Sequence, residues 1–459
     1  MPRHKKSTAR ETAAFILAAV DSRGAFSDRL LTSHLAKTHL SQEDRNFVTY
    51  LVNGTLRWRG RLDWVLSRFL QTDLQELPIW IRNVLRMGAF QILFMERVPV
   101  SAATDESVKL ARKRGHPGTA GLVNAVLRRL VREKDVLEYP DMDGEPVRAI
   151  SVFYSHPEWM VERWLRRFGK ERVIRICEAN NSLDHLFVRA NLMRAEPHEL
   201  VRLFTERGSQ AVVGTLNFSV IRVRGHLSPS TDAAFKDGLY TPQDEAESLV
   251  VRLLSPETGR LFLDACAGPG GKATQIGETT EDKRLVCCLE VYEARARQVR
   301  DSAERVGLRS LKVVAGDGRA IPFGVKFDRV LVDAPCSGLG VLGKRADARW
   351  RKKESALQVL SGLQQELLQS ASALVEEKGI LVYSVCSFEP EETAEVVSRF
   401  VEKNPGFETD DASSFVGGSF VNSDGAMQIL PDELGTDGVF AVRMRRKVKR
   451  RQGSFAEPA

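Results

Sequence analysis

The sequence predicts three folded parts: an all-α N-terminal part, a small α+β module, and a C-terminal α/β domain with a doubly wound parallel sheet. Three patterns support this prediction. Apolar residues recur at intervals of three and four through residues 8–135, a helical segment and short β-branched runs share residues 150–235, and from about Leu261 apolar strands alternate with helices. Such alternation is typical of parallel sheets, whose ligands bind beyond the carboxyl ends of the strands.

The N-terminal part is predicted to be a helical bundle. Segments 81–94 and 122–130 repeat the spacing of the first predicted helix, whose apolar face carries Ala13, Ile16, Leu17 and Val20. A linker follows at residues 138–146, which hold two prolines, one glycine and four acidic residues. We expect a helical domain at 1–140, the small module at 150–235, the α/β domain at 240–447 and a basic tail at 448–459.

The alternation of the C-terminal domain can be followed strand by strand. Its longest predicted helix spans residues 355–375, where leucines recur at helical intervals. Six apolar strands are expected, at residues 261–263, 285–289, 311–314, 330–332, 380–383 and 439–442.

Composition limits the class of protein. Of 459 residues, 43% are hydrophobic and 28% charged, which is typical of a soluble globular chain. No run approaches the roughly 18 to 20 apolar residues of a membrane helix. The basic N-terminal segment contains Glu11 among spaced apolar positions, which favours an amphipathic helix over a signal peptide. We therefore expect a cytoplasmic protein that does not insert into a membrane.

The charge is unevenly distributed. Residues 1–140 hold 23 basic and 14 acidic residues, a net +9 against +7 for the whole chain, although seven Lys or Arg also lie between Arg443 and Arg451. A basic excess favours a polyanionic partner, because each neutralised phosphate releases counterions. A solvated surface with a basic tail explains the same charge, and charge alone leaves the two interpretations even.

The six cysteines exclude two kinds of site. No CxxC pair occurs, so zinc ribbons and thioredoxin chemistry are not expected, and no metal site is predicted. Six cysteines in so long a chain are too sparse for a disulfide scaffold, which favours a reduced compartment. Cys177, Cys287 and Cys288 are predicted to be core residues.

A glycine-rich turn follows the first predicted strand, in the segment DACAGPGGK at 264–272. Its three glycines allow the backbone to approach a nucleotide-like ligand closely, although a structural turn also explains them. Glu290 ends the second strand about 20 residues later, where an acid accepts both hydroxyls of a ribose. Asp317 ends the third strand at the same edge and suits an adenine amino group, or alternatively caps a turn.

Two cysteines follow the fourth and fifth predicted strands. Cys336 stands in DAPCSG at 333–338, close to Asp333, and Cys386 stands in YSVCS at 383–387. A lone cysteine is more often a small buried hydrophobe than a nucleophile. Two cysteines at equivalent positions on the ligand edge, one of them near a carboxylate, favour covalent chemistry instead.

These three segments resemble those of the S-adenosylmethionine-dependent RNA cytosine-5 methyltransferases. Val385 departs from the family pattern, which normally has threonine before the cysteine at the fifth strand. The N-terminal helices, with LVNAVLR at 122–128, resemble the NusB-type RNA-binding domain, and the resemblance covers nearly the whole chain. It implies an all-α NusB-like domain, the small α+β module and a Rossmann-like methyltransferase domain. Further matching segments lie at 156–159, 168–169, 179–181, 189–191, 243–246 and 437–440.

The resemblance also implies a reaction. A methyl group passes from S-adenosylmethionine to C5 of a cytosine in small-subunit (16S) rRNA, after a cysteine thiolate adds to C6. The resemblance assigns Cys386 as the nucleophile, Cys336 to product release and Asp333 to the N3 and amino edge of the cytosine. It assigns the cofactor to Cys266, Ala267, Gly268, Pro269, Gly270, Gly271, Lys272, Glu290, Asp317 and Asp333. We expect a monomer whose partner is small-subunit rRNA, without a metal.

A basic loop at 343–353 follows the fourth strand and its cysteine. We expect Arg349, Trp350 and Arg351 to contact RNA by stacking and through phosphates, in preference to forming a solvated basic loop. Two further basic residues are candidates for lowering the pKa of a thiol or for holding phosphates, namely Lys272 and Arg345.

Two other classes of protein remain as alternatives. One is a non-catalytic RNA-binding factor similar to antitermination proteins, which the basic helical part alone favours; the pair Cys336 and Cys386 and the glycine-rich turn argue against it. The other is a DNA cytosine methyltransferase, whose nucleophile usually follows a proline after the fourth strand, as in Pro335-Cys336. Cys386 and the NusB-like helices argue against that alternative.

Overall fold

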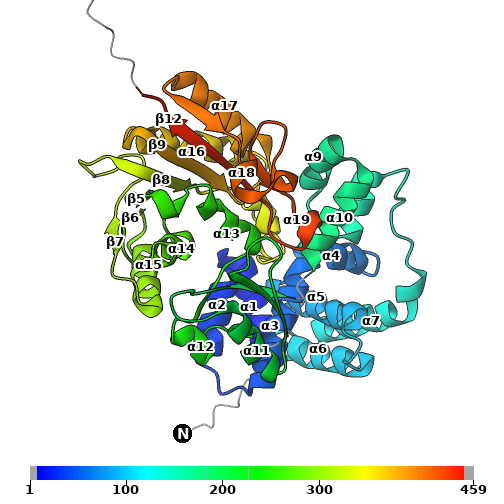
Figure 1. Cartoon of the computed structure of the whole chain (residues 1–459). Helices are drawn as coiled ribbons and strands as arrows, with labels where there is room; N and C mark the ends of the chain where they lie inside the picture. Colours follow the sequence, from blue (N-terminus) through cyan, green and yellow to red (C-terminus); the bar gives the residue numbers. More distant parts are fainter. Residues whose placement is uncertain (1–7, 183–184, 226, 449–459) are drawn as a thin grey trace, which may run out of the picture. The chain divides into compact units, whose positions relative to one another are not determined.

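The computed structural model describes residues 8–182, 185–225 and 227–448 (Figure 1). The chain divides into two compact units, Met1–Asn181 with Leu342–Lys352, and Ser182–Val341 with Lys353–Ala459. We call the first the helical unit; the second contains both β-sheets. The segment Leu342–Lys352 therefore belongs to the helical unit, although its flanking residues belong to the other unit.

Helix α5 (Ile79–Phe94) is the most buried helix of the N-terminal part, and 13 of its 16 residues are buried. It packs against α1, α3, α4, α6 and α7. Helix α3 approaches so closely that a Cβ at Gly54 would lie 2.0 Å from the Phe90 ring, so only glycine fits there. The all-α prediction is confirmed by α1 Ala9–Arg23, α2 Ser27–Leu35, α3 Gln42–Arg57, α4 Arg59–Ser67, α6 Val100–Arg114 and α7 Pro117–Glu133.

Local sequence signals set the ends of these helices. Helix α1 begins after Thr8, whose hydroxyl accepts a hydrogen bond from the Glu11 N–H, and it ends at Gly24, which has a φ of 59°. Pro117 opens α7, where its missing N–H removes no helical hydrogen bond. Three more helices complete the helical unit, α8 Pro146–Phe153, α9 Glu158–Phe168 and α10 Lys170–Asn181.

A four-stranded antiparallel sheet forms the middle module, in the order β2-β3-β1-β4. Its strands are β1 Leu186–Ala190, β2 Gln210–Val213, β3 Val220–Arg224 and β4 Tyr240–Pro242. Helices α11 (Pro197–Glu206) and α12 (Ala233–Lys236) share a core with the sheet that includes Phe204 and Tyr240. The predicted α+β class of this module is therefore confirmed, although α9 and α10, which lie within its predicted span, belong to the helical unit. The predicted bounds of the module, 150–235, stay a prediction.

The large sheet has eight strands, seven of them in the order β10-β12-β9-β8-β5-β6-β7, while β11 pairs with β12. All six predicted strands are present. The five from β5 to β9 are parallel, and β12 is antiparallel to β9. The strands are β5 Leu261–Asp264, β6 Leu285–Glu290, β7 Leu311–Ala315, β8 Phe327–Asp333, β9 Val375–Val385, β10 Phe407–Asp410, β11 Met427–Ile429 and β12 Val439–Arg446.

Helices cover both faces of the large sheet, as a doubly wound fold requires. Side chains alternate along each strand, so Phe262 lies in one core and Leu263 in the other. The Phe262 core is completed by α13 Glu245–Arg252, α14 Gly271–Thr279 and α15 Glu293–Val306, and the Leu263 core by α16 Ala356–Ser372 and α17 Ala394–Lys403 (Figure 1). Two short helices follow, α18 Ser413–Val416 and α19 Pro431–Leu434. Across the described ranges, no helix is both long and apolar enough to span a membrane.

Candidate active site

The predicted site residues lie where parallel strands of the large sheet end. The strand order reverses at β5, which has β6 on one side and β8 on the other, and ligands of such sheets bind at this switch point. Asp264 ends β5, Glu290 ends β6 and Asp333 ends β8, while Cys386 directly follows β9. Asp333 pairs in register with Ser384, so the segments after β8 and β9 leave the sheet side by side.

The glycine-rich turn joins β5 to α14 and is held by Glu290. The Gly268 N–H donates a hydrogen bond of 3.1 Å to one carboxylate oxygen of Glu290, and the Tyr292 N–H donates one of 3.1 Å to the other. A Cβ at Gly268 would lie 2.3 Å from Glu290 Oε2, and Gly270 has a φ of 111°, so both positions require glycine. The predicted turn and the predicted acid therefore form a single hydrogen-bonded structure, in which Glu290 is buried and Pro269 is exposed.

The other residues predicted to bind a cofactor differ in their accessibility. Ala267 is buried, and burial raises the pKa of the neighbouring Cys266 thiol. Gly271 has open space around it, because a Cβ there would meet nothing within 4 Å. Asp317 is partly exposed, and hydrogen bonds from Arg319 to both of its oxygens lower the pKa of Asp317. A ligand of Asp317 would therefore have to displace or share this ion pair.

The two predicted active-site cysteines lie next to each other. Their Sγ atoms are 3.0 Å apart, and both residues are half-buried. The hydrogen bond with Cys336, followed by burial, raises the pKa of Cys386 well above that of an ordinary thiol. Cys177 and Cys288 are fully buried, as predicted for core residues, and Cys287 is half-buried against the Leu263 core.

An ion pair lies beside the thiols. Lys272, in the first turn of α14, donates a hydrogen bond of 2.8 Å to Asp333 Oδ2, and the Ser384 hydroxyl donates one of 2.7 Å to Asp333 Oδ1. Burial disfavours the charged form of Lys272, but the carboxylates of Asp333 and Glu247 outweigh burial and raise the pKa of Lys272. Lys272 is therefore a firmly held cation whose charge interacts with Cys386.

Two carboxylates at this edge are absent from the prediction. Asp264 is 1% exposed, and burial, followed by repulsion from Asp333, raises the pKa of Asp264 to about 7. Glu247 on α13 adds its charge to the surroundings of Lys272 and Cys386. The position of Asp264 at the end of a buried strand is a signal that the sequence contains, whereas no motif links Glu247 to this edge. Within the described residues, no group of three or more His, Cys, Asp or Glu is arranged to hold a metal ion.

The basic loop after β8 overturns one prediction. Arg349 is 0% exposed, and its guanidinium donates hydrogen bonds to the carbonyl oxygens of Ser155 (3.0 Å) and Asn180 (2.9 Å) and to the side chain of Asn181 (2.9 Å). Burial, followed by repulsion from Arg57, lowers the pKa of Arg349 to about 9. A side chain enclosed in the helical unit cannot reach an RNA base, so the predicted RNA contact of Arg349 is wrong.

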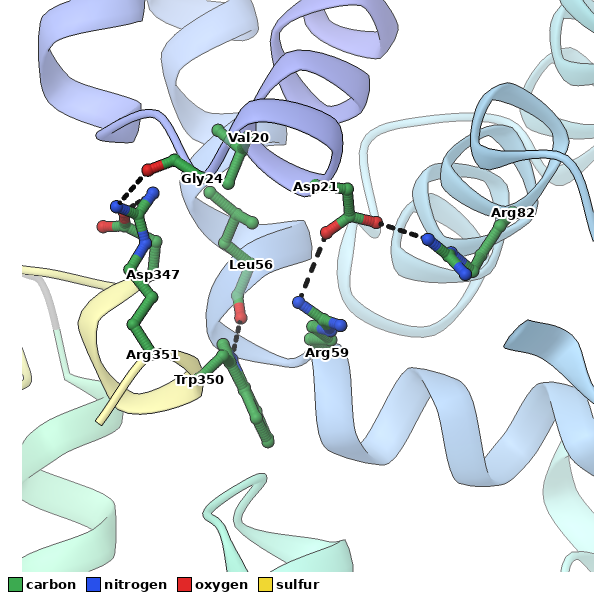
Figure 2. A pocket seen from close by; sticks show the side chains of 9 residues that line it. All are labelled: Val20, Asp21, Gly24, Leu56, Arg59, Arg82, Asp347, Trp350 and Arg351. Atoms are coloured by element: carbon green, nitrogen blue, oxygen red, sulfur yellow. Dashed lines mark hydrogen bonds and ion pairs between the residues drawn. The ribbon is translucent and has the colours of Figure 1, made fainter. Parts of the chain in front are cut away.

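Trp350 and Arg351 line a pocket of 220 Å³ in the helical unit (Figure 2). The Trp350 Nε1 donates a hydrogen bond of 2.7 Å to the Leu56 carbonyl oxygen, and Arg351 donates to backbone carbonyls that follow α1. Arg59, which also lines the pocket, forms an ion pair of 3.3 Å with Asp21 (Figure 2). These contacts fix the loop to the helices, and RNA contact by Trp350 and Arg351 stays a prediction.

Comparison with known proteins identifies the family. A profile described as 16S rRNA methyltransferase RsmB/F matches residues 251–445, the NusB family profile matches 7–132, and a profile for an RsmF/B-like ferredoxin-like domain matches 156–228. The "Probable ribosomal RNA small subunit methyltransferase B" of Bacillus subtilis (strain 168) is 34% identical over 457 residues, which cover 96% of this chain and 100% of that protein. The chain belongs to the ribosomal RNA small subunit methyltransferase B family.

Further relatives agree with this assignment. The ribosomal RNA small subunit methyltransferase B of Pseudomonas putida is 31% identical over 438 residues, covering 95% of this chain and 98% of that protein. The crystal structure titled PH0851 has the same fold, with a TM-score of 0.81 and 24% identity over 96% of this chain and all of that chain. The structure titled NSun6 from Pyrococcus horikoshii with SFG covers 62% of this chain and 97% of its own, with a TM-score of 0.56 and 20% identity.

Membership of the family confirms the predicted fold class. The chain consists of a NusB-like N-terminal domain, a ferredoxin-like module and a Rossmann-like methyltransferase domain.

Proposed function

We propose that the protein methylates C5 of a cytosine in small-subunit (16S) rRNA, with S-adenosylmethionine as methyl donor and a transient bond between Cys386 Sγ and C6 of the base. The observation that supports this proposal best is the pair of thiols 3.0 Å apart, beside the Lys272–Asp333 ion pair, in the methyltransferase domain. A nitrogen or oxygen acceptor is nucleophilic by itself, whereas C5 of cytosine needs a thiolate on C6 to become so.

The glycine-rich turn fits S-adenosylmethionine, which supplies a methyl group carried on a sulfonium. Open space at Gly271 allows close approach of a ligand to the backbone. Each oxygen of Glu290 accepts one hydrogen bond within the described chain, so both retain capacity for ribose hydroxyls. Asp317 would bind the adenine amino group after separating from Arg319, and the segment 266–272 would line the remainder of the site.

Cys386 is the proposed nucleophile, and its surroundings control its proton. Its raised pKa means that the resting thiol keeps its proton, which has to leave before Sγ can attack C6. The ammonium group of Lys272 favours that thiolate by its charge. Addition to C6 makes C5 an enamine-like nucleophile. After methylation, a base takes the C5 proton, the electrons of that C–H bond form the C5–C6 double bond again, and the bond between C6 and sulfur breaks with its electrons on sulfur. This restores the aromatic base and the free thiolate.

Asp333 is the group proposed to hold the cytosine edge. An ionised carboxylate has about four acceptor positions, and Lys272 and Ser384 occupy two of them. The remaining positions suit a protonated N3 and the exocyclic amine, and a proton at N3 makes C6 more electrophilic. Cys336 lies close enough to Cys386 to take part in release of the product.

The test of this function combines a cellular map with transfer in solution. We expect one or a few 5-methylcytosines in 16S rRNA to disappear from cells that lack the gene and to return with the intact gene. The purified protein should transfer label from methyl-labelled S-adenosylmethionine to small-subunit rRNA and not to double-stranded DNA. Transfer to DNA alone would establish the DNA methyltransferase alternative, and RNA binding without transfer would establish the non-catalytic one. An rRNA substrate also places the reaction in the cytoplasm.

A further inference from the structure

One buried carboxylate holds the residues next to both thiols. Glu392 ends the short 3-10 helix Pro390–Glu392 after β9, and it is 0% exposed. Its Oε2 accepts hydrogen bonds of 2.5 Å from the hydroxyls of both Ser337 and Ser387. Each of these serines directly follows one of the two active-site cysteines, so a single oxygen joins the two cysteine segments.

The other carboxylate oxygen acts mainly on the segment that carries Cys336. Oε1 of Glu392 accepts the Ser337 N–H at 2.7 Å and the side-chain amide of Gln364 at 3.2 Å. Gln364 also donates to the Pro335 carbonyl oxygen at 2.9 Å, on the other side of the cysteine. The Tyr383 hydroxyl fixes the backbone of Glu392 by donating to its carbonyl oxygen at 2.6 Å.

Stability alone does not explain this arrangement. Four donors match the acceptor capacity of an ionised carboxylate, yet no Lys or Arg forms an ion pair with Glu392 in the part of the chain that the structure describes. Even a buried ion pair can often be replaced as a whole by apolar residues without loss of stability, so a buried carboxylate is weak evidence for a stabilising role. Three of the four hydrogen bonds come from Ser337 and Ser387, which points to control of the cysteine geometry.

We propose that Glu392 is a positioning residue that fixes the Cys336 thiol against the Cys386 thiol and thereby sets how fast the covalent RNA adduct is resolved. The proposal rests on the function proposed above, because the adduct belongs to that reaction. Glu392 makes more contacts around Cys336 than around Cys386, so its loss releases mainly the Cys336 segment. Addition of Cys386 to the base continues, while resolution of the adduct slows.

The first experiment measures the geometry of the thiols without RNA. In the full-length protein, the thiol oxidant diamide joins Cys336 and Cys386 in a disulfide and is itself reduced to the hydrazine, taking up both hydrogens. Peptide mass spectrometry follows the rate. Glu392→Ala should slow it on the order of tenfold, because the reacting atoms lose their alignment. Glu392→Gln should keep most of the rate, because the serine hydroxyls can rotate to accept from its amide.

Matched variants separate positioning from general damage to the fold. Glu395→Ala removes a half-exposed carboxylate of the next helix, which pairs with Arg399, and should leave the oxidation rate unchanged. Ser337→Ala and Ser387→Ala each remove single donors, so they stay informative even where Glu392→Ala fails to fold. Ser337→Ala should slow oxidation, and unchanged rates in both serine variants would overturn the proposal.

The second experiment uses RNA and S-adenosylmethionine. Glu392→Ala should bind the cofactor as the wild type does and should accumulate an RNA adduct, seen as a ribonuclease-sensitive shifted band on a denaturing gel. The proposal would be overturned if Glu392→Ala formed the disulfide and resolved the RNA adduct at the rates of the wild type. A third outcome separates the two proposals. If thiol oxidation were slowed in Glu392→Ala but no RNA adduct formed in Glu392→Ala or in Cys336→Ala, Glu392 would still position the thiols, and the proposed reaction would be refuted.

Discussion

Each compact unit of this protein contains a largely enclosed cation near a cysteine, but the two pairs differ. Lys272 lies 2.8 Å from the carboxylate of Asp333, and nearby carboxylates raise the pKa of Lys272 despite its burial. Arg349 binds carbonyl and amide oxygens, and burial lowers the pKa of Arg349 to about 9. The cysteine near Arg349, Cys177, is fully buried and its pKa is raised by burial, whereas Cys386 is half-buried beside a second thiol.

The comparison shows that a cation near a cysteine does not by itself make a nucleophile. At the sheet edge, the cation is neutralised by a carboxylate that also has acceptor positions left for a substrate. In the helical unit, the guanidinium of Arg349 donates hydrogen bonds to neighbouring segments of the chain, so its role there is to hold the loop in place. Substitutions at the two sites should therefore fail in different ways.

The largest expected effect is on methyl transfer and adduct formation when single cysteines are replaced. Cys386→Ala should lower methyl transfer by at least about 10³-fold and form no RNA adduct, because no thiolate remains to add to C6. Cys336→Ala or Cys336→Ser should still form the adduct but accumulate it. Cys177→Ala should transfer methyl groups at the wild-type rate.

Denaturing gels with and without ribonuclease, together with label transfer, check these three outcomes. An adduct in Cys386→Ala that is lost in Cys336→Ala would reverse the proposed roles. Such a reversal would favour the chemistry of the DNA methyltransferase alternative, in which the cysteine after the proline attacks.

The two cations should be distinguished next. Lys272→Met should lower kcat by about 10² to 10³-fold, because it removes a charge that favours the Cys386 thiolate. Its pH profile should also shift, with activity recovering partly at high pH as the thiol ionises without help. An unchanged kcat and pH profile in Lys272→Met would show that the cation does not act on Cys386.

Arg349→Met should act on stability instead of on chemistry. It leaves two carbonyl oxygens and one side-chain amide without donors, and we expect a loss of about 2–3 kcal/mol in unfolding free energy. Arg129→Met, at an exposed arginine paired with Glu133, should change stability by less than about 0.5 kcal/mol. Urea denaturation measures both, and equal stabilities of the two variants would contradict a structural role for Arg349.

The sequence predicted the sheet edge far better than it predicted the loop. Strand β9 and the cysteine after it were predictable because a buried parallel strand is a run of apolar residues whose end marks the ligand side of the sheet. The sequence of the basic loop at 343–353, with Arg349 and Trp350, contains no comparable signal. Basic and aromatic residues suit both an RNA surface and a polar anchor, and only tertiary packing decides between them. No sequence pattern indicates Glu247 or Glu392, because their contacts depend on how distant segments pack.

A smaller effect is expected at the glycine-rich turn. Glu290→Ala should weaken S-adenosylmethionine binding roughly 30-fold, about 2 kcal/mol, because it removes the proposed ribose acceptor and the bond that holds Gly268. Gly270→Val should weaken it too, because valine is strained at a φ of 111°. Glu293→Ala, at an exposed carboxylate paired with Arg297, is the control and should bind normally. Calorimetric titration measures the affinity for S-adenosylmethionine. Equal affinities in all three variants would show that the cofactor binds outside the glycine-rich turn.

The smallest expected effect concerns the excess of carboxylates at the sheet edge. Burial and repulsion from Asp333 raise the pKa of Asp264 from 3.8 to about 7. Between these values the folded protein keeps a proton that the unfolded chain has lost, so this group lowers stability as pH rises, by about 1.4 kcal/mol per pH unit. Asp264→Asn has no such proton, so its stability should depend less on pH between about pH 5 and pH 6. Urea midpoints at both pH values, with Asp301→Asn at an exposed position as control, measure the difference. Equal pH dependence in Asp264→Asn and the wild type would show that the pKa of Asp264 is not raised in the folded protein. The charge of Lys272 would then offset the repulsion between Asp264 and Asp333.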